Sequence, residues 1–240
     1  MSLALEHKRR ILALGPDAAS GGVDPAYSAD TALTSPANAQ KHLKLMETAL
    51  AQDLERLSAI KSLDTRQQLK RDELLPKYMD YVERYRDSGL NYPNPVLTQV
   101  VVWLFDTVQF DLGLEVALFA MGQDQQMPER FLRRDLQTFV ADAVIDWAEA
   151  EHKAKRSPEP YVSSLLPFVD GEWDLFEGIT ARYHKVLGIQ ALDANEWTKA
   201  IEHFERAIEL YPEIGVGTRL GGARKALEKQ QKEQAEQATE

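Results

Sequence analysis

A cluster of basic side chains in residues 56–71 could contact the phosphates of a nucleic acid. The stretch holds five Lys and Arg against one Asp, a local charge of +4. Fixed cations attract phosphate oxygens and release the counterions that surround nucleic acids. The pattern predicts phosphate contact; the alternative is a solvated helix face that keeps the protein soluble. The basic residues are Arg56, Lys61, Arg66, Lys70 and Arg71.

Three pairs of acids could instead hold a divalent cation for nuclease chemistry, because carboxylate oxygens coordinate Mg²⁺. No pair has a Lys or His at a diagnostic spacing, and we interpret the acids as surface carboxylates or helix starts. We therefore assign no catalytic residue, no metal ligand and no cofactor. Mg²⁺ is expected only if the chain is itself an endonuclease. The pairs are Asp142 with Asp146, Asp106 with Asp111, and Asp170 with Asp174.

Other chemistries find no support in the residue types. The five His are scattered, and the absence of Cys excludes disulfides, thiolate zinc sites and cysteine nucleophiles. No glycine loop of the phosphate-binding kind occurs, which excludes a motor ATPase. No apolar run reaches the ~18 residues that span a bilayer. These features predict a cytoplasmic protein with no membrane partner.

Charge is distributed unevenly along the chain. The net charge of -10 combines +1 in residues 1–86 with -11 in residues 87–240. The first part therefore suits a phosphate-bearing partner, whereas the second suits contact with protein.

Helical periodicity divides the chain into segments, and the fold class is all-α. Residues 1–34 read as a flexible arm rich in Ala, Gly, Ser and Pro. Residues 35–88 read as a helical hairpin: Ser35 caps a helix that ends near Leu63. Asp64 or Thr65 caps the second helix, which runs to about Tyr85 and bends or breaks at Pro76.

A helical core should follow over residues 89–152, with a helix that begins at Pro95, one around LEVALFAM after Gly113, and one over 136–147. Residues 153–169 read as a polar linker. The segment 170–230 then contains a long helix from Asp170, a helical hairpin and a capping helix, and 231–240 form a disordered tail.

The stretch from Tyr183 to Pro212 has the spacing of one tetratricopeptide repeat, a helix-turn-helix unit. Leu187 and Gly188 close one helix of the unit against the next. Such a hairpin cannot bury its apolar stripe alone, so it is expected to stack on other helices of this chain or on another subunit. The partner-binding candidates are Trp197, Phe204 and Arg206.

Several motifs together resemble one protein family over roughly residues 40–225. The family is the small terminase subunit of temperate tailed phages of the peduovirus type, whose members are often described as the endonuclease subunit of the terminase. The motifs are ELLP (73–76), W-x-x-D-T (103–107), the Met127-Pro128 step and the run from HK (184–185) to ERA (205–207).

The resemblance implies a DNA-packaging protein that recognises the cohesive-end region of double-stranded viral DNA. It also implies a homo-oligomer, expected as a ring, and a large subunit that carries the ATPase and nuclease. Two alternatives remain open: an endonuclease that acts itself on cohesive ends, and a helical-repeat adaptor without DNA binding. The expected phosphate-binding residues are Lys41, Lys44, Arg56, Lys61, Arg66, Lys70 and Arg71.

Overall fold

The computed structural model describes residues 28, 32–33, 35–131 and 135–237. No strand occurs among these residues, and the all-α prediction is confirmed. Most of the predicted arm, 1–34, lies outside the described residues. The helices are α2 (Pro36–Ala59), α3 (Leu63–Leu69), α4 (Leu75–Ser88), α5 (Pro95–Asp106), α6 (Phe110–Gly122), α7 (Leu136–Lys153), α8 (Tyr161–Pro167), α9 (Glu177–Asp193), α10 (Trp197–Leu210) and α11 (Gly217–Gln237).

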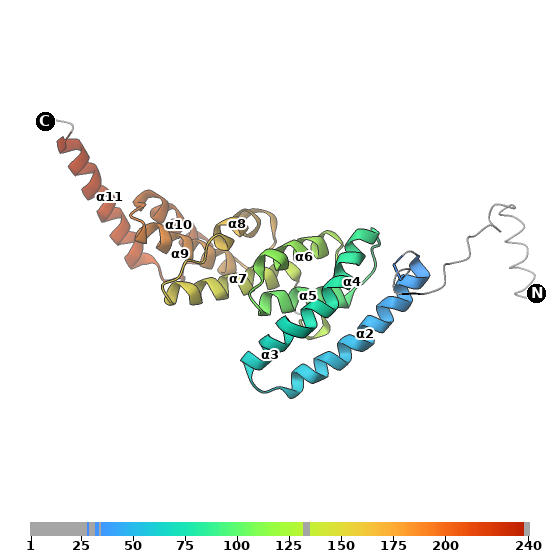
Figure 1. Ribbon diagram of the computed structural model, residues 1–240. Coiled ribbons are helices and arrows are strands. Elements are labelled where there is room, and N and C mark those ends of the chain that lie inside the picture. The colour runs from blue at the N-terminus through green and yellow to red at the C-terminus, as the bar shows by residue number, and fades with distance from the viewer. Residues whose placement is uncertain (1–27, 29–31, 34, 132–134, 238–240) are drawn as a thin grey trace, which may run out of the picture.

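The helices form an elongated arrangement (Figure 1). The hairpin of α2 with α3 and α4 lies at one end, and α11 extends at the opposite end. Between them α5, α6 and α7 pack together, and α9 packs on α7. Two apolar clusters follow this order: a large one from α2 to α9, and a smaller one from α9 to α11. Because α9 contributes to both, it joins the two ends.

The second helix of the N-terminal hairpin begins at a different residue from the one expected. Ser35 caps α2 as predicted, but Ser62 caps α3 by accepting a hydrogen bond from the Thr65 backbone N–H at 3.3 Å. The helix also continues through Pro76, after a π turn at Lys70–Leu74. In this turn the Leu75 N–H donates to the Lys70 carbonyl, five residues earlier. The helical hydrogen-bond pattern thus changes just before Pro76, which has no N–H to donate.

The central helices lie where the periodicity placed them, and α5 is buried from Val96 to Phe105. Asn94 caps α5 by accepting from the Leu97 N–H at 3.1 Å, and Pro95 takes the first helical position, as predicted. Trp103 is fully buried. The next helix, α6, begins at Phe110, before the expected start.

The segment 153–169 is only partly irregular. It contains α8, whose Val162 and Leu165 are buried in the large apolar cluster. The long helix begins at Glu177, not at Asp170, because a π turn at Phe168–Glu172 precedes it and Asp170 has non-helical φ and ψ angles of -108° and 27°.

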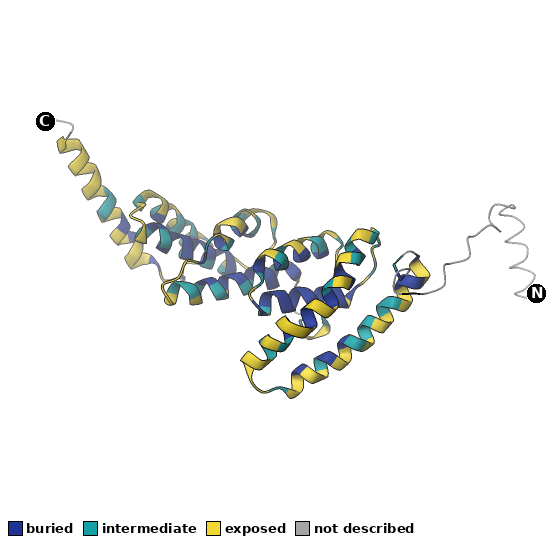
Figure 2. Cartoon of the chain, viewed as in Figure 1, coloured by how far each residue is buried: buried dark blue, intermediate teal, exposed yellow. Residues whose placement is uncertain are grey.

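The helix α11 extends into the segment predicted as a tail, to Gln237, and residues 238–240 lie outside the described part. Only Leu220 and Ala223 of α11 are buried, and residues 228–237 are exposed (Figure 2).

The hairpin of α9 and α10 is present, and its apolar stripe faces inward. Gly188 lies against the ring of Phe204, which is fully buried. Ala200 and Ala207 are buried beside it, as the spacing predicted. The assignment of this hairpin as a tetratricopeptide repeat stays a prediction.

Replacing Gly188 by Ala should destabilise the protein, because the added Cβ would lie 2.6 Å from the Phe204 ring. Overpacking of this kind costs about 1–3 kcal/mol of unfolding free energy, measurable by urea denaturation. The matched control is Gly222→Ala on α11, where a Cβ meets nothing within 4 Å. The control should be neutral or slightly stabilising, since Ala favours helix over Gly. Equal behaviour of the two variants would contradict the close packing.

Candidate nucleic-acid interface

The predicted phosphate-binding residues all lie on the hairpin of α2 with α3 and α4. Serine caps start both arms, and residues 60–62 form the short connection that turns the chain back. The stripe of α2 that faces the second arm contains Leu50, Asp53 and Leu57, all buried. One of these three is a charged residue.

The buried carboxylate of Asp53 holds the two arms together. Its side chain is 4% exposed and accepts hydrogen bonds from three donors. Arg56 Nη1 lies at 3.0 Å, Lys77 Nζ at 2.6 Å and the Tyr78 hydroxyl at 2.9 Å. Lys77 and Tyr78 belong to α4, so Asp53 connects α2 to α4 directly.

The protonation of Asp53 follows from these contacts. Burial disfavours the carboxylate, but the hydrogen bonds from Lys77, Tyr78 and Arg56 outweigh that effect and lower the pKa below its usual value. Burial and the Asp53 charge together raise the pKa of Tyr78. The ionised carboxylate is therefore the form that closes the hairpin.

Two of the seven predicted cations form ion pairs within the chain. Lys70 is only 10% exposed at its side chain and donates to Asp106 Oδ2 at 2.7 Å, which ties the hairpin to the end of α5. Arg56 binds Glu73 at 2.9 Å in addition to Asp53. The charge of Lys70 is thus withdrawn from the surface, and that of Arg56 is offset by two acids.

The other predicted cations form two groups. The first, which we call the α2 pair, is Lys41 and Lys44. Both are exposed and point away from the buried stripe of α2. Lys44 precedes the end of α2 at Ala59 by fifteen residues, or about 22 Å at ~1.5 Å per residue. The α2 pair is thus well separated from the hairpin turn.

The second group, the tip cations, is Lys61, Arg66 and Arg71 near the turn. Lys61 and Arg71 are exposed, and Arg66 is half-buried. Arg66 Nη2 donates to the Lys61 carbonyl at 3.3 Å, so the structure brings these two residues together as expected. No ion pair involves the tip cations or the α2 pair among the described residues.

A groove of about 490 Å³ separates the two arms near the turn. Its charged lining is Arg56, Asp72 and Glu73, a net negative set. A phosphate inside the groove would meet two carboxylates, so the outer faces of the hairpin suit a nucleic acid better.

Four of the six acids considered for nuclease chemistry take part in ion pairs: Asp106, Asp142, Asp146 and Asp170. Asp142, Asp146 and Glu149 on α7 surround Arg182 of α9 at 3.9, 2.6 and 3.0 Å. Burial disfavours the Arg182 charge, but Glu149 and Asp146 raise its pKa. Asp106 is the partner of Lys70. Among the described residues, no three His, Asp or Glu side chains converge as a metal site would require.

The three partner-binding candidates lie in different environments. Phe204 is fully buried against Gly188, so its ring packs inside the chain and is not offered to a partner. Arg206 binds Asp170 Oδ1 at 2.7 Å and Glu209 at 2.8 Å. Trp197 is half-buried at the start of α10. Phe204 therefore lines the inside of the hairpin, and the role of these three residues in partner binding stays a prediction.

Sequence reasoning missed the imidazole pair beside Arg206. His184 Nδ1 lies 3.0 Å from His203 Nδ1, and His184 Nε2 lies 2.9 Å from Asp170 Oδ2. Because the Asp170 carboxylate accepts, His184 Nε2 carries a proton and the neutral ring accepts from His203 at Nδ1. Burial lowers the pKa of both histidines. The two residues are nineteen apart in sequence and form no recognisable motif.

Comparison with known proteins shows which family the chain belongs to. The family described as "Phage small terminase subunit" matches residues 47–178, more than half of the chain. The match includes most of the hairpin, the central helices and α8. The chain belongs to the phage small terminase subunit family, which confirms the resemblance seen in the sequence motifs.

Two relatives come from phages. The "Probable terminase, endonuclease subunit" of Haemophilus phage HP1 is 32% identical over 72% of this chain and 66% of that protein, just under two thirds of its length. The "Terminase, endonuclease subunit" of Escherichia phage P2 is 26% identical over 81% of this chain and 78% of that protein. No solved structure matches the chain. Within the described residues, no helix is both long and apolar enough to cross a membrane.

Replacing Asp53 by Asn should open the hairpin more easily, because the amide cannot offset two cations. We expect a loss of about 2–3 kcal/mol in unfolding free energy, less than for a fully buried pair because Arg56 and Lys77 are half exposed. The lowered pKa stabilises the fold above the unfolded-state value of about 4, and this contribution disappears as the pH falls through the folded-state value.

Urea denaturation of both proteins from neutral to acidic pH tests the role of Asp53. The difference between wild type and Asp53→Asn should shrink as the medium becomes acidic. Glu55→Gln, which removes an exposed acid from the same helix, is the matched control and should change little. A difference independent of pH would show that the Asp53 charge is not what holds the arms.

Proposed function

We propose that this terminase small subunit recognises the cohesive-end region of double-stranded viral DNA and passes it to a large subunit that carries the ATPase and nuclease. Family membership supports the setting, and the hairpin supports the DNA contact. One observation carries the proposal. The α2 pair, Lys61 and Arg71 are exposed and make no ion pair among the described residues, although acids are in excess over the whole chain.

The proposed contact is with the phosphate backbone. Exposed Lys and Arg neutralise phosphates and release counterions without reading base edges, so they supply affinity and position rather than sequence choice. The α2 pair and the tip cations would follow the backbone at two places on one hairpin. Lys70 and Arg56 would support this surface from behind by fixing the hairpin geometry.

Few cations per subunit give modest affinity, and assembly would raise it. In a homo-oligomer, such as a ring, each additional subunit binds the same DNA at a high effective concentration. The C-terminal part, with Trp197 at its surface and a strongly acidic composition, would contact another copy or the large subunit. The proposed setting is the cytoplasm of the host cell.

Removing the α2 pair or the tip cations should weaken DNA binding. The variants are Lys41→Gln with Lys44→Gln, and Lys61→Gln with Arg71→Gln. Each lost phosphate contact should reduce the slope of log affinity against log salt by ~0.9, and each double variant should bind a cohesive-end duplex about tenfold more weakly at low salt. Fluorescence anisotropy over a salt series measures both quantities.

The matched control is Lys225→Gln with Lys229→Gln on α11, which removes the same charge from the far end of the molecule and should leave DNA binding unchanged. Lys70→Met should lower stability, because Asp106 loses its partner, with little change in the salt slope of the folded protein. Duplex binding that is equal in the wild type and both hairpin variants would overturn the proposed surface. No DNA binding at any salt would favour the adaptor alternative.

The endonuclease alternative has one observation in its favour: both phage relatives carry the word endonuclease in their names. Against it, Asp142 and Asp146 are bound to Arg182 and are not free to coordinate Mg²⁺ together. We expect the purified chain with Mg²⁺ to leave a plasmid that carries the cohesive-end site intact. Agarose gels detect nicking. Nicking that disappears in folded Asp142→Asn/Asp146→Asn protein would establish the alternative.

A further inference from the structure

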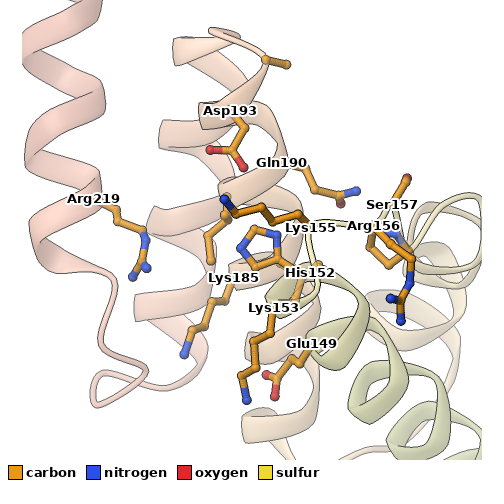
Figure 3. Close-up of a pocket in the computed structure, with 14 residues that line it drawn as sticks. Glu149, His152, Lys153, Lys155, Arg156, Ser157, Lys185, Gln190, Asp193 and Arg219 are labelled. Atoms are coloured by element: carbon orange, nitrogen blue, oxygen red, sulfur yellow. The ribbon is translucent and has the colours of Figure 1, made fainter.

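A cavity of about 1040 Å³ lies between the end of α7, the loop that follows it, α9 and the first turn of α11. Figure 3 shows cationic side chains from these elements around one space, with Glu149 and Asp193 as the acids of the lining. The lining therefore has a net charge of +3, although residues 87–240 together have -11. The cations are Lys153, Lys155, Arg156, Lys185 and Arg219.

Three of these cations are not used by the fold. Lys153, Lys155 and Arg219 are exposed and make no ion pair among the described residues. Arg156, in contrast, is bound by Glu151 through two hydrogen bonds of 2.5 and 2.6 Å, and Lys185 donates to a backbone carbonyl at 3.3 Å. The lining acid Glu149 is offset by Arg182 at 3.0 Å. A backbone carbonyl is neutral, so Lys185 keeps its charge, and four of the five cations have no ion pair among the described residues.

Stabilisation of the local helix does not explain the positions of all three cations. Lys153 and Lys155 lie at the C-terminus of α7, where the helix dipole favours cations. The Lys155 N–H bonds to the His152 carbonyl and the Arg156 N–H to the Glu151 carbonyl, both at 2.9 Å, which fixes Lys155 at a φ of 58°. Arg219, however, lies in the first turn of α11, where the dipole disfavours a cation. The helix dipole therefore does not account for the position of Arg219.

We propose that this cavity binds the phosphate groups of a nucleotide, either free or at the end of a nucleic-acid strand. Lys ammonium groups bind phosphate as point charges, and Arg adds a planar donor pair. The apolar wall formed by Val186 and Ile189 suits a ring. The cavity is of the size of small-ligand sites and is too small for a duplex. The inference does not depend on the DNA contact proposed for the hairpin.

The site variant is Lys153→Gln, Lys155→Asn and Arg219→Gln. Asn is chosen at 155 because it tolerates the left-handed backbone that the position adopts. The control variant, Lys225→Gln, Lys229→Gln and Lys232→Gln, removes the same charge from the exposed part of α11. The probes are ATP, inorganic tripolyphosphate, a 5′-phosphorylated single-stranded hexanucleotide and a hexaglutamate peptide, titrated by calorimetry at low salt.

Wild type and control should bind at least one phosphate probe, and the site variant should bind it about tenfold or more weakly, as expected for lost charge-assisted contacts. ATP or tripolyphosphate as the best probe would indicate a free ligand, and the hexanucleotide a strand end. Three results would overturn the proposal: no phosphate binding, equal binding by site variant and wild type, or tighter binding of hexaglutamate, which would indicate an acidic protein partner.

A second measurement uses the unaltered protein and does not depend on how the site variant folds. Saturating phosphate probe should protect Lys153 and Lys155 from acetylation, while Lys225 and Lys232 react as before, read by mass spectrometry. Unprotected Lys153 and Lys155 would overturn the site. The hairpin variants should bind the phosphate probe as the wild type does. The DNA contact proposed for the hairpin and the phosphate site proposed for the cavity can therefore fail independently of each other.

Discussion

The geometry of the N-terminal hairpin depends on one buried carboxylate. Asp53 is placed among apolar side chains of α2, where an unpaired charge would be strongly unfavourable. Arg56, Lys77 and Tyr78 offset that penalty, and two of the three come from the other arm. Separating the arms would expose the Asp53 carboxylate to water or leave it buried without a partner. The relative position of the two arms is therefore set more narrowly than apolar contact alone would set it.

In the C-terminal half, too, one carboxylate accepts hydrogen bonds from side chains of different helices. Asp170, in the π turn before α9, accepts from His184 at 2.9 Å and from both ends of the Arg206 guanidinium at 2.7 and 3.1 Å. These contacts join the π turn to α9 and α10. In each hairpin, an apolar stripe thus determines which helix faces are buried, and one carboxylate determines how the helices align.

Short-range signals in the sequence predicted most elements correctly. Ser35 before Pro36 and Asn94 before Pro95 are capping patterns whose physics is local, and the stripe of α10 follows from spacing within one helix. Long-range partners were not predictable. Lys70 and Asp106 are 36 residues apart, so periodicity placed Lys70 on a cationic face while the fold turned it inward.

The division between internal and surface cations gives salt a selective effect. Exposed charges such as Lys44 and Lys61 are screened at distances beyond about 8 Å in physiological salt, whereas pairs that are partly buried are screened much less. The contacts of Asp53 and Lys70 belong to the second kind, at 2.6–3.0 Å and with one partner withdrawn from water. Raising the salt concentration should therefore disrupt the proposed DNA contact while the hairpin stays closed, because attraction to phosphate and closure of the arms depend on different charges.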